Sequence, residues 1–333
     1  MKVFTKDIKL ARIISLIFAL VILFCYPLSG CNKENINKPN PITFIEGFSV
    51  NFIDVGNGDC IFITFPDGKN MMIDCGQRSK GNFSAIKEVV NTYSKGVINS
   101  LVLTHPDVDH VGNAVDVINE FSIERCYLPN VALLDDYYTF KQTVATLNNK
   151  NIKYDYSNEY ISFVGEDYFV AFLSPLSTSS GGYYGEFNAS KEPSDVEVNN
   201  LSPIIYVEYK GVRFLFTGDA GKSQEKLLLK SVESNFPAHV HGSSINLYDI
   251  DVLKVAHHGA EDCTSEEFLE VVNPTYAVIS VGSNNVFGHP SSLTLNRLYN
   301  RNPSVEILRT DVLGTITFGV DSQGKITIHK QSE

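Results

Sequence analysis

Short apolar runs of about four to eight residues recur along the chain, and stretches of helical periodicity lie between them. Runs at 48–55, 60–65 and 70–74 predict three strands, because turn sequences that contain glycine separate them. Apolar residues at every third or fourth position predict a helix over 83–93. A fourth strand, expected at 100–104, follows that helix.

The rest of the chain continues this alternation. We expect strands at 123–128, 161–164, 169–173, 201–209, 212–216, 251–256, 276–281, 305–308, 314–320 and 325–329, and helices after Gly112 and at 136–148, 223–232 and 293–299. Both halves of the chain begin with strand pairs and end with strand–helix units. This pattern favours two similar sheets packed face to face, with helices outside them.

Four of the expected strands end in loops that carry histidine or aspartate. The candidate side chains at these strand ends are His105, Asp107, Asp109, His110, Asp219, His257, His258 and His289. Because α/β sheets place their sites at the carboxyl ends of strands, we expect these side chains to converge. Crowding them together unpaired is costly, and a bound zinc, manganese or iron ion would remove that cost. An exposed polar loop is the alternative at the first cluster.

The first thirty residues have the pattern of a secretory signal peptide. Basic residues precede an apolar segment, 13–26, that is shorter than the roughly twenty residues needed to span a bilayer. The leader ends in Leu28-Ser29-Gly30-Cys31, which resembles the bacterial lipobox. That resemblance implies cleavage before Cys31 and attachment of lipid to its sulfur. An ordinary signal peptide or an uncleaved anchor is the alternative.

We therefore divide the chain into a lipoprotein signal peptide over 1–30, a lipidated flexible tether over 31–46 and one large domain over 47–333. The protein is expected to be exported and anchored to the bacterial cell membrane by lipid on Cys31. A long polar stretch at 174–200, rich in Ser, Gly and Tyr, is expected to shape a substrate groove or to be an exposed loop.

The chain is acidic, with 27 Lys and Arg against 38 Asp and Glu and a net charge of −11. Such a surface repels phosphate backbones at long range, so we expect no tight non-specific binding of nucleic acid. The charge still permits hydrolysis of a phosphodiester that is held at metal ions.

Two of the six cysteines lie in the leader or at its cleavage site. The other four, Cys60, Cys75, Cys126 and Cys263, have no close C-x-x-C spacing. Export would allow them to oxidise. Cys60 and Cys75 lie in apolar runs, however, where a small buried thiol is the commoner case, so we expect free thiols.

Six motifs of this chain resemble those of the metallo-β-lactamase superfamily, in particular the branch with the hydrolase domain of the ComEC-type competence proteins. In the family's order, they are FIDVGNGD at 52–59, MIDCG at 72–76, LTHPDVDH at 103–110, FTGD at 216–219, LKVAHHG at 253–259 and GHP at 288–290. The resemblance implies an α+β fold, the four-layer αββα sandwich, with a metal site at one edge of the two sheets. It does not extend to the membrane-channel domains of competence proteins, so it implies no role in DNA uptake.

The resemblance also implies which residues hold two divalent metal ions. One ion would be held by Asp109, His110, Asp219 and His257, and the other by His105, Asp107 and the bridging Asp219, with Asn200 as a further candidate. Asp107 stands where the commoner motif has histidine. The segment 199–202 likewise has no histidine, where one is usual. Asp107 makes the first metal position richer in oxygen, which favours harder metals, so manganese and iron are alternatives to zinc. An asparagine at the second position is a weaker ligand than histidine or no ligand.

The resemblance implies catalytic roles for Asp109, His258 and His289. His289 is the candidate acid for the leaving group, or else a structural residue before Pro290. Which of His257 and His258 binds metal stays open on the sequence alone.

Three further aspartates lie near the expected site. Asp54 and Asp59 are candidates to orient the metal ligands, although Asp59 could equally cap its own turn. Asp74 ends an expected strand at the same sheet edge as the metal-binding loop.

The activity implied by this resemblance is metal-dependent hydrolysis, in which two metals share a hydroxide and polarise the bond under attack. The carboxylate-rich site favours a phosphodiesterase or nuclease-like enzyme with a phosphodiester or small-molecule substrate. A lactone or β-lactam hydrolase is one alternative, and a non-catalytic surface lipoprotein that binds a ligand is another. No Gly-x-Ser-x-Gly motif is present, so no protein nucleophile is expected.

Overall fold

The structure is a computed structural model that describes residues 40–131, 136–176, 194–233, 245–283 and 285–332. The expected signal peptide, the lipid site at Cys31 and most of the stretch 174–200 lie outside the described residues, so these predictions stay untested. None of the helices in the described part has the length and apolar character that crossing a bilayer requires.

The first sheet contains eight strands of the described residues. They are β1 Phe48–Phe52, β2 Ile61–Thr64, β3 Asn70–Ile73, β4 Val97–Val102, β5 Ser122–Leu128, β6 Lys153–Tyr156, β14 Ile316–Val320 and β15 Ile326–Lys330. Their order across the sheet is β15-β14-β1-β2-β3-β4-β5-β6. The strands β3 to β6 run parallel to one another, and the other neighbours are antiparallel.

The second sheet contains seven strands in the same part of the chain. They are β7 Ser162–Val164, β8 Tyr168–Phe172, β9 Ile205–Tyr209, β10 Val212–Phe216, β11 Val252–Lys254, β12 Tyr276–Ile279 and β13 Glu306–Arg309. Their order is β13-β12-β11-β10-β9-β8-β7. The strands β10 to β13 run parallel, and β7 to β10 run antiparallel.

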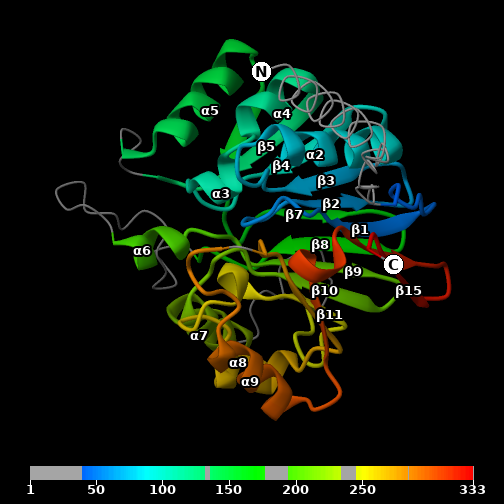
Figure 1. Cartoon of the computed structure of the whole chain (residues 1–333), viewed down its shortest axis with the longest axis vertical. Coiled ribbons are helices and arrows are strands. Elements are labelled where there is room, and N and C mark those ends of the chain that lie inside the picture. Colours follow the sequence, from blue (N-terminus) through cyan, green and yellow to red (C-terminus); the bar gives the residue numbers. More distant parts are fainter. Residues whose placement is uncertain (1–39, 132–135, 177–193, 234–244, 284, 333) are drawn as a thin grey trace, which may run out of the picture. The chain divides into compact units, whose positions relative to one another are not determined.

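Helices cover the outer face of each sheet (Figure 1). The first sheet is covered by α2 Lys80–Ser94, α4 Ala114–Glu120 and α5 Tyr138–Asn149, and the second by α7 Lys222–Glu233, α8 Glu266–Val272 and α9 Ser292–Arg301. The connections contain the short helices α3 Val108–Val111, α6 Asp195–Asn199 and α10 Thr310–Leu313, and the 3₁₀ turn η3 Ala256–Gly259.

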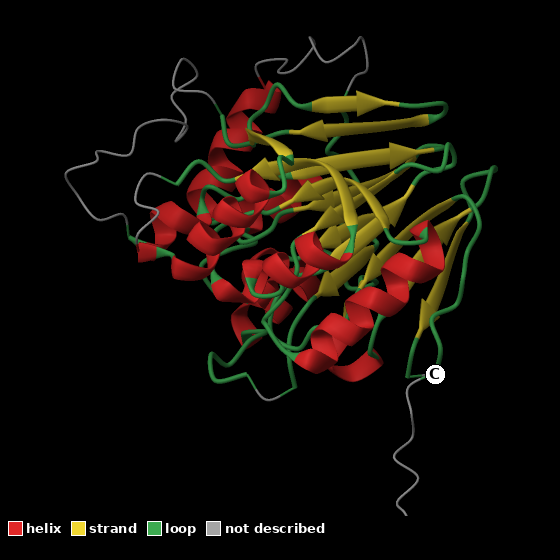
Figure 2. Cartoon of the chain, turned by 90° about the horizontal axis from the view of Figure 1, so that it is seen from above, coloured by secondary structure: helices red, strands yellow, loops and turns green. Residues whose placement is uncertain are grey.

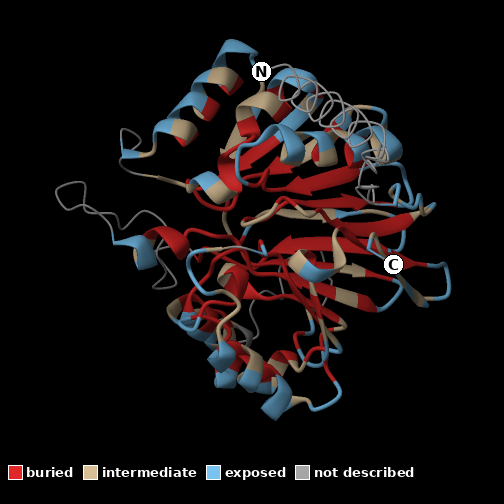
Figure 3. Ribbon diagram, viewed as in Figure 1, coloured by how far each residue is buried: buried red, intermediate tan, exposed pale blue. Residues whose placement is uncertain are grey.

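The two sheets pack face to face through large apolar side chains. Phe48 of β1 lies against Phe214 of β10, with ring centroids 5.5 Å apart, and Phe52 lies 6.0 Å from Phe216. Because side chains alternate along a strand, every second side chain points to the outer face of its sheet. Phe62 of β2 is one of these and packs in the apolar cluster beneath α2. The central strands are therefore buried (Figure 3), between helices on either side (Figure 2). The expected αββα sandwich is confirmed.

Two of the differences between the expected and the observed strands, at β6 and β4, have a physical explanation. The strand β6 is a half-exposed edge strand whose residues have no apolar periodicity, so the sequence does not predict it. The strand β4 begins at Val97, before the expected residue 100. Asn70 and Asn99 extend its pairing, because each side-chain oxygen accepts the other's backbone N–H, at 2.9 and 3.0 Å.

The carboxyl ends of β3 and β4 in one sheet and of β10, β11 and β12 in the other lead into the site. The four cysteines of the described domain are free and buried, as their apolar surroundings predict. The fold therefore delivers the candidate ligands from strand ends and leaves the thiols in the core.

Candidate metal centre

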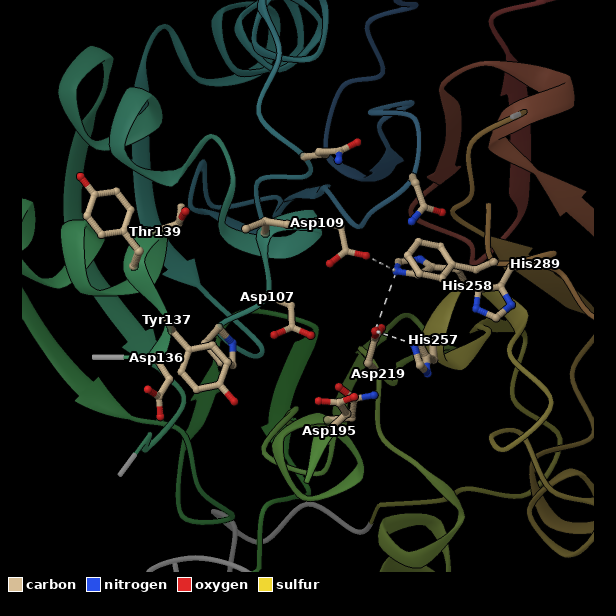
Figure 4. A pocket seen from close by; sticks show the side chains of 17 residues that line it. Asp107, Asp109, Asp136, Tyr137, Thr139, Asp195, Asp219, His257, His258 and His289 are labelled. Carbon is tan, nitrogen blue, oxygen red and sulfur yellow. Dashed lines mark ion pairs between the residues drawn. The ribbon is translucent and has the colours of Figure 1, made fainter. Parts of the chain in front are cut away.

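The carboxylate of Asp219 lies among four imidazole rings, and Figure 4 shows two of them, those of His257 and His258, beside it. Its Oδ2 atom is 3.3 Å from Nε2 of His110, 3.5 Å from Nε2 of His105, 3.7 Å from Nε2 of His257 and 3.8 Å from Nε2 of His258. These side chains follow β4, β10 and β11. Three segments that are distant in the sequence therefore meet at one carboxylate.

Two glycines allow the loops at this edge to approach each other. A Cβ at Gly218, where φ is +49°, would lie 3.0 Å from Cβ of Ser202. A Cβ at Gly58, where φ is +133°, would lie 2.1 Å from the carbonyl oxygen of Asp109. Only glycine tolerates this backbone conformation together with so close a contact.

A buried hydrogen-bond network orients His110. The Asp74 carboxylate accepts the backbone N–H of Thr104 at 2.8 Å and its hydroxyl at 2.6 Å, and it lies 2.7 Å from Nδ1 of His110. In the neutral ring, donation from Nδ1 to this carboxylate leaves the Nε2 lone pair directed at a cation beside Asp219. Asp74 thus has a specific role that the sequence suggested only by position.

Hydroxyl groups flank His105 on the side away from Asp219. Its Nδ1 lies 3.1 Å from Oγ of Thr104 and 3.5 Å from Oγ of Ser202. The Ser202 hydroxyl also accepts the backbone N–H of Asp219 at 3.2 Å. Ser202 lies in the segment 199–202, which lacks the usual histidine, and it supports both His105 and Asp219. Sequence reasoning missed it because a serine carries no metal-ligand signature.

The two consecutive histidines have different environments. His258 is buried, and its Nδ1 donates to the carbonyl of Ser280 at 2.8 Å, while its Nε2 lies 3.3 Å from Oδ2 of Asp109. His257 is more exposed, and its Nδ1 lies 3.9 Å from Oδ1 of Asp262. The ligand atoms of His110, Asp219 and His258 all lie within 4.8 Å of one another. This geometry favours His258 over His257 as the ligand.

Alanine variants of the two histidines test this preference. We expect His258→Ala to weaken the binding of zinc or manganese by at least about 10–100-fold, because it removes a buried ligand and not only an outer contact. His257→Ala should leave the metal affinity nearly unchanged. Competition with a chromogenic chelator measures both affinities on one scale. The reverse order of effects would assign the ligand role to His257.

The buried polar atoms of this centre fit divalent cations. Nε2 of His105, His110 and His258 and Oδ1 of Asp219 are buried and have no hydrogen-bond partner within the described structure. Leaving such atoms unpaired is costly, and a cation between them would satisfy all four. Nitrogen and carboxylate donors of this kind are those that zinc, manganese and iron accept.

The charges in the centre act on one another. Burial alone would raise the pKa of the Asp219 carboxyl, but the surrounding imidazoles, first of all His110, hold that pKa well below its usual value. Burial and the neighbouring His110 ring lower the pKa of His105 to about 3. His105 is therefore neutral at pH 7, which is the form of imidazole that binds metal.

The centre opens into a pocket of about 720 Å³ that also holds Asp107, Asp109 and His289. Burial raises the pKa of Asp107 to about 6, and its Oδ2 lies 3.8 Å from Nε2 of His105. The ring of His289 stacks on Phe287, with centroids 5.9 Å apart. These candidates thus lie around the same pocket as Asp219, His257 and His258 (Figure 4).

Two other candidates contact different groups. The side-chain oxygen of Asn200 accepts the backbone N–H of Gly221 at 3.1 Å, and its amide donates to Ser223 at 2.8 Å. Asp54 accepts the backbone N–H of Gly56 at 3.0 Å, within its own turn. These contacts assign Asn200 to the loop before α7 and Asp54 to a turn, and within the described residues neither side chain forms a hydrogen bond or ion pair with a candidate ligand histidine.

Asp59 lies behind His258 and forms a buried ion pair. Its Oδ2 pairs with Nζ of Lys254, and its Oδ1 lies 3.6 Å from Nδ1 of His258. Lys254 also donates to the carbonyl of Gly218 at 3.2 Å. Sequence reasoning missed Lys254, because a lysine in a strand is expected to reach solvent, whereas this one is fully buried.

Residues 53–136 match the sequence profile of the Metallo-beta-lactamase superfamily. The resemblance to this superfamily is confirmed. The matched segment includes the metal-binding loop, with His105, Asp107, Asp109 and His110. The later candidates, from Asp219 onward, lie outside this match, and the metallo-β-lactamase fold brings them to the same edge.

Three curated proteins show the competence-protein branch of this resemblance. The chain is 28% identical over 314 residues to ComE operon protein 3 of Bacillus subtilis, covering 90% of this chain and 34% of that protein. It is 26% identical over 293 residues to Recombination protein 2 of Haemophilus influenzae, covering 86% and 30%. It is 34% identical over 140 residues to Competence protein ComA of Neisseria gonorrhoeae, covering 42% and 18%. The chain spans about a third of the length of the first two relatives.

Proposed function

We propose that the domain is a metal-dependent hydrolase that cleaves phosphodiesters at a dinuclear site. The observation that carries this proposal is the convergence of four imidazole Nε2 atoms on Asp219 beside a pocket of about 720 Å³. Pockets of this size hold small molecules or one end of a larger one. Names of relatives that refer to competence and recombination support a phosphodiester as the target.

Asp219 would be shared between the two cations. His105 and Asp107 would hold one of them, and Asp109, His110 and His258 the other. A divalent cation lowers the pKa of a bound water and polarises the bond under attack, which is the chemistry that this pair would supply.

The chain itself orients these groups and supplies a proton donor. Asp74 orients His110, and the carbonyl of Ser280 orients His258. His289 lies beside His257 on the pocket wall, with ring centroids 5.5 Å apart. Burial and the neighbouring His257 lower the pKa of His289, so its ring is neutral at pH 7 and would take up a proton before donating one to a leaving oxygen. A carbonyl hydrolase is the second candidate, and the oxygen-rich donor set weighs against it.

The full-length protein, loaded with zinc or manganese, should hydrolyse bis-p-nitrophenyl phosphate and leave a chromogenic β-lactam intact. EDTA should abolish the hydrolysis, and added metal should restore it, since the metal ions would supply the activated water. Elemental analysis of the same sample shows that metal is bound. Cleavage of the lactam alone would support the carbonyl hydrolase. Cleavage of neither substrate by metal-loaded protein would contradict an enzyme and favour a binding protein.

A further inference from the structure

The pocket has a second side, opposite the histidines, that is acidic and aromatic. Asp136 and Tyr137 lie across the pocket from His258 and His289, and Asp195 of α6 lies below Asp219 (Figure 4). Tyr138, which begins α5, also lines this pocket. This side is formed by the start of α5 and by the short helix α6, and none of the metal ligands comes from either of them.

Among the described residues that line the pocket, no cation balances the charge of this side. None of the 17 described residues that line the pocket is a lysine or an arginine. Neither Asp136 nor Asp195 has a salt bridge or side-chain hydrogen bond within the described structure. Burial raises the pKa of Tyr137, and the carboxylates of Asp107, Asp195 and Asp136 raise it further, so all three act on the same small volume.

The same pocket contains buried groups that point to a ligand. His258 and Asp219 are 1% and 2% exposed, and Nε2 of the first and Oδ1 of the second have no hydrogen-bond partner in the part of the chain that the structure describes. The acidic side is thus one wall of a cavity whose floor contains His258 and Asp219, with polar atoms free to bind. One ester arm of a phosphodiester held at that floor can reach these carboxylates, because they line the same pocket.

We propose that the substrate arm which meets this side carries a positively charged ammonium group, and that Asp136, Asp195 and the ring of Tyr137 select for it. This inference rests on the proposed phosphodiesterase function. Carboxylates attract an ammonium ion and repel the further phosphates of a nucleic acid strand. An aromatic face adds attraction for the same cation. In the reaction, water forms a new P–O bond, one ester P–O bond breaks, and the leaving oxygen takes up a proton, so no redox partner is needed.

The test compares two substrates that differ only in this charge: p-nitrophenyl phosphocholine and its uncharged 3,3-dimethylbutyl isostere. For the full-length, metal-loaded protein, we expect kcat/KM to be about tenfold higher for the cationic substrate, from two carboxylate contacts and one ring contact. The variant Asp136→Asn/Asp195→Asn should lose this preference, because its kcat/KM should fall about tenfold more on the cationic substrate than on the isostere. Glu124→Gln, at an exposed carboxylate of β5 that does not line the pocket, should keep it.

Binding provides an independent measurement. Calorimetric titration with phosphocholine and with 3,3-dimethylbutyl phosphate should show the same ratio of affinities and the same dependence on the two aspartates. Equal kcat/KM and equal affinity for both members of each pair would overturn the inference and leave the phosphodiesterase intact. Faster cleavage of a thymidine phosphodiester than of the cationic substrate would also overturn it. Selective binding of phosphocholine without hydrolysis of any diester would support the cation subsite and contradict the proposed function.

Discussion

Replacement of Asp219 by alanine is expected to abolish phosphodiester hydrolysis and most metal binding. This carboxylate lies within 3.8 Å of four imidazole nitrogens, at the place where the proposed cations would share it. The loss should exceed the roughly 10–100-fold effect that is typical of a residue which only orients a ligand. Steady-state kinetics and elemental analysis of the purified variant measure the two effects.

The matched control for this variant is Asp116→Ala. Asp116 is an aspartate of α4 that pairs with Arg78 and does not line the pocket. Circular dichroism of both variants shows whether the fold is kept. Normal hydrolysis by a folded Asp219→Ala protein would contradict the two-metal mechanism, and loss of activity in the control would show that the assay reports stability instead.

The second large effect is expected at the buried pair of Lys254 and Asp59. Replacing Lys254 by methionine leaves the Asp59 carboxylate buried without its partner, and both residues are at most 1% exposed. Removing one member of a buried ion pair costs about 3–5 kcal/mol of the free energy of unfolding. Urea denaturation of the metal-free protein measures this loss.

The double variant Asp59→Asn/Lys254→Met separates the charge from the packing. It removes both charges, so it should recover most of the stability that the single variant loses, since replacing a whole buried pair is often nearly neutral. A single variant that loses less than about 1 kcal/mol would show that water reaches Asp59 or that another cation replaces Lys254. Catalysis should fall in both variants, because the pair links the carbonyl of Gly218 to the loop behind His258.

Much of this site could be located from the sequence, because the relevant signals are local. A buried strand has a run of apolar residues, and the polar residue that ends it is adjacent in the chain. His105, Asp109, His110 and Asp219 were therefore predictable as strand-end side chains. The helices α2, α5 and α9 follow from apolar residues at helical spacing in the same way.

The residues that support these ligands were not predictable, because their partners are far away in the sequence. Ser202 contacts His105 across 97 positions, and Lys254 reaches Asp59 from the other sheet. Neither side chain has a local signature, and Asn200, a better ligand by residue type, turns instead to Gly221. The preference for His258 over His257 likewise depends on Ser280, at the end of β12.

The sequence by itself determined most of the strands, most of the covering helices and the order in which ligands appear, since these depend on the repeat of side-chain direction along a helix or a strand. It gave no signal for the edge strand β6 or for α8. Only the tertiary structure decided that the hairpin β14–β15 joins the first sheet beside β1. It also decided that the carboxyl ends of the parallel strands of both sheets meet at Asp219. Strand pairing and sheet packing are settled by contacts between distant segments. The acidic side of the pocket likewise depends on the packing of α5 and α6 beside the candidate metal centre. Its residues come from two distant segments, so no local sequence pattern predicts it.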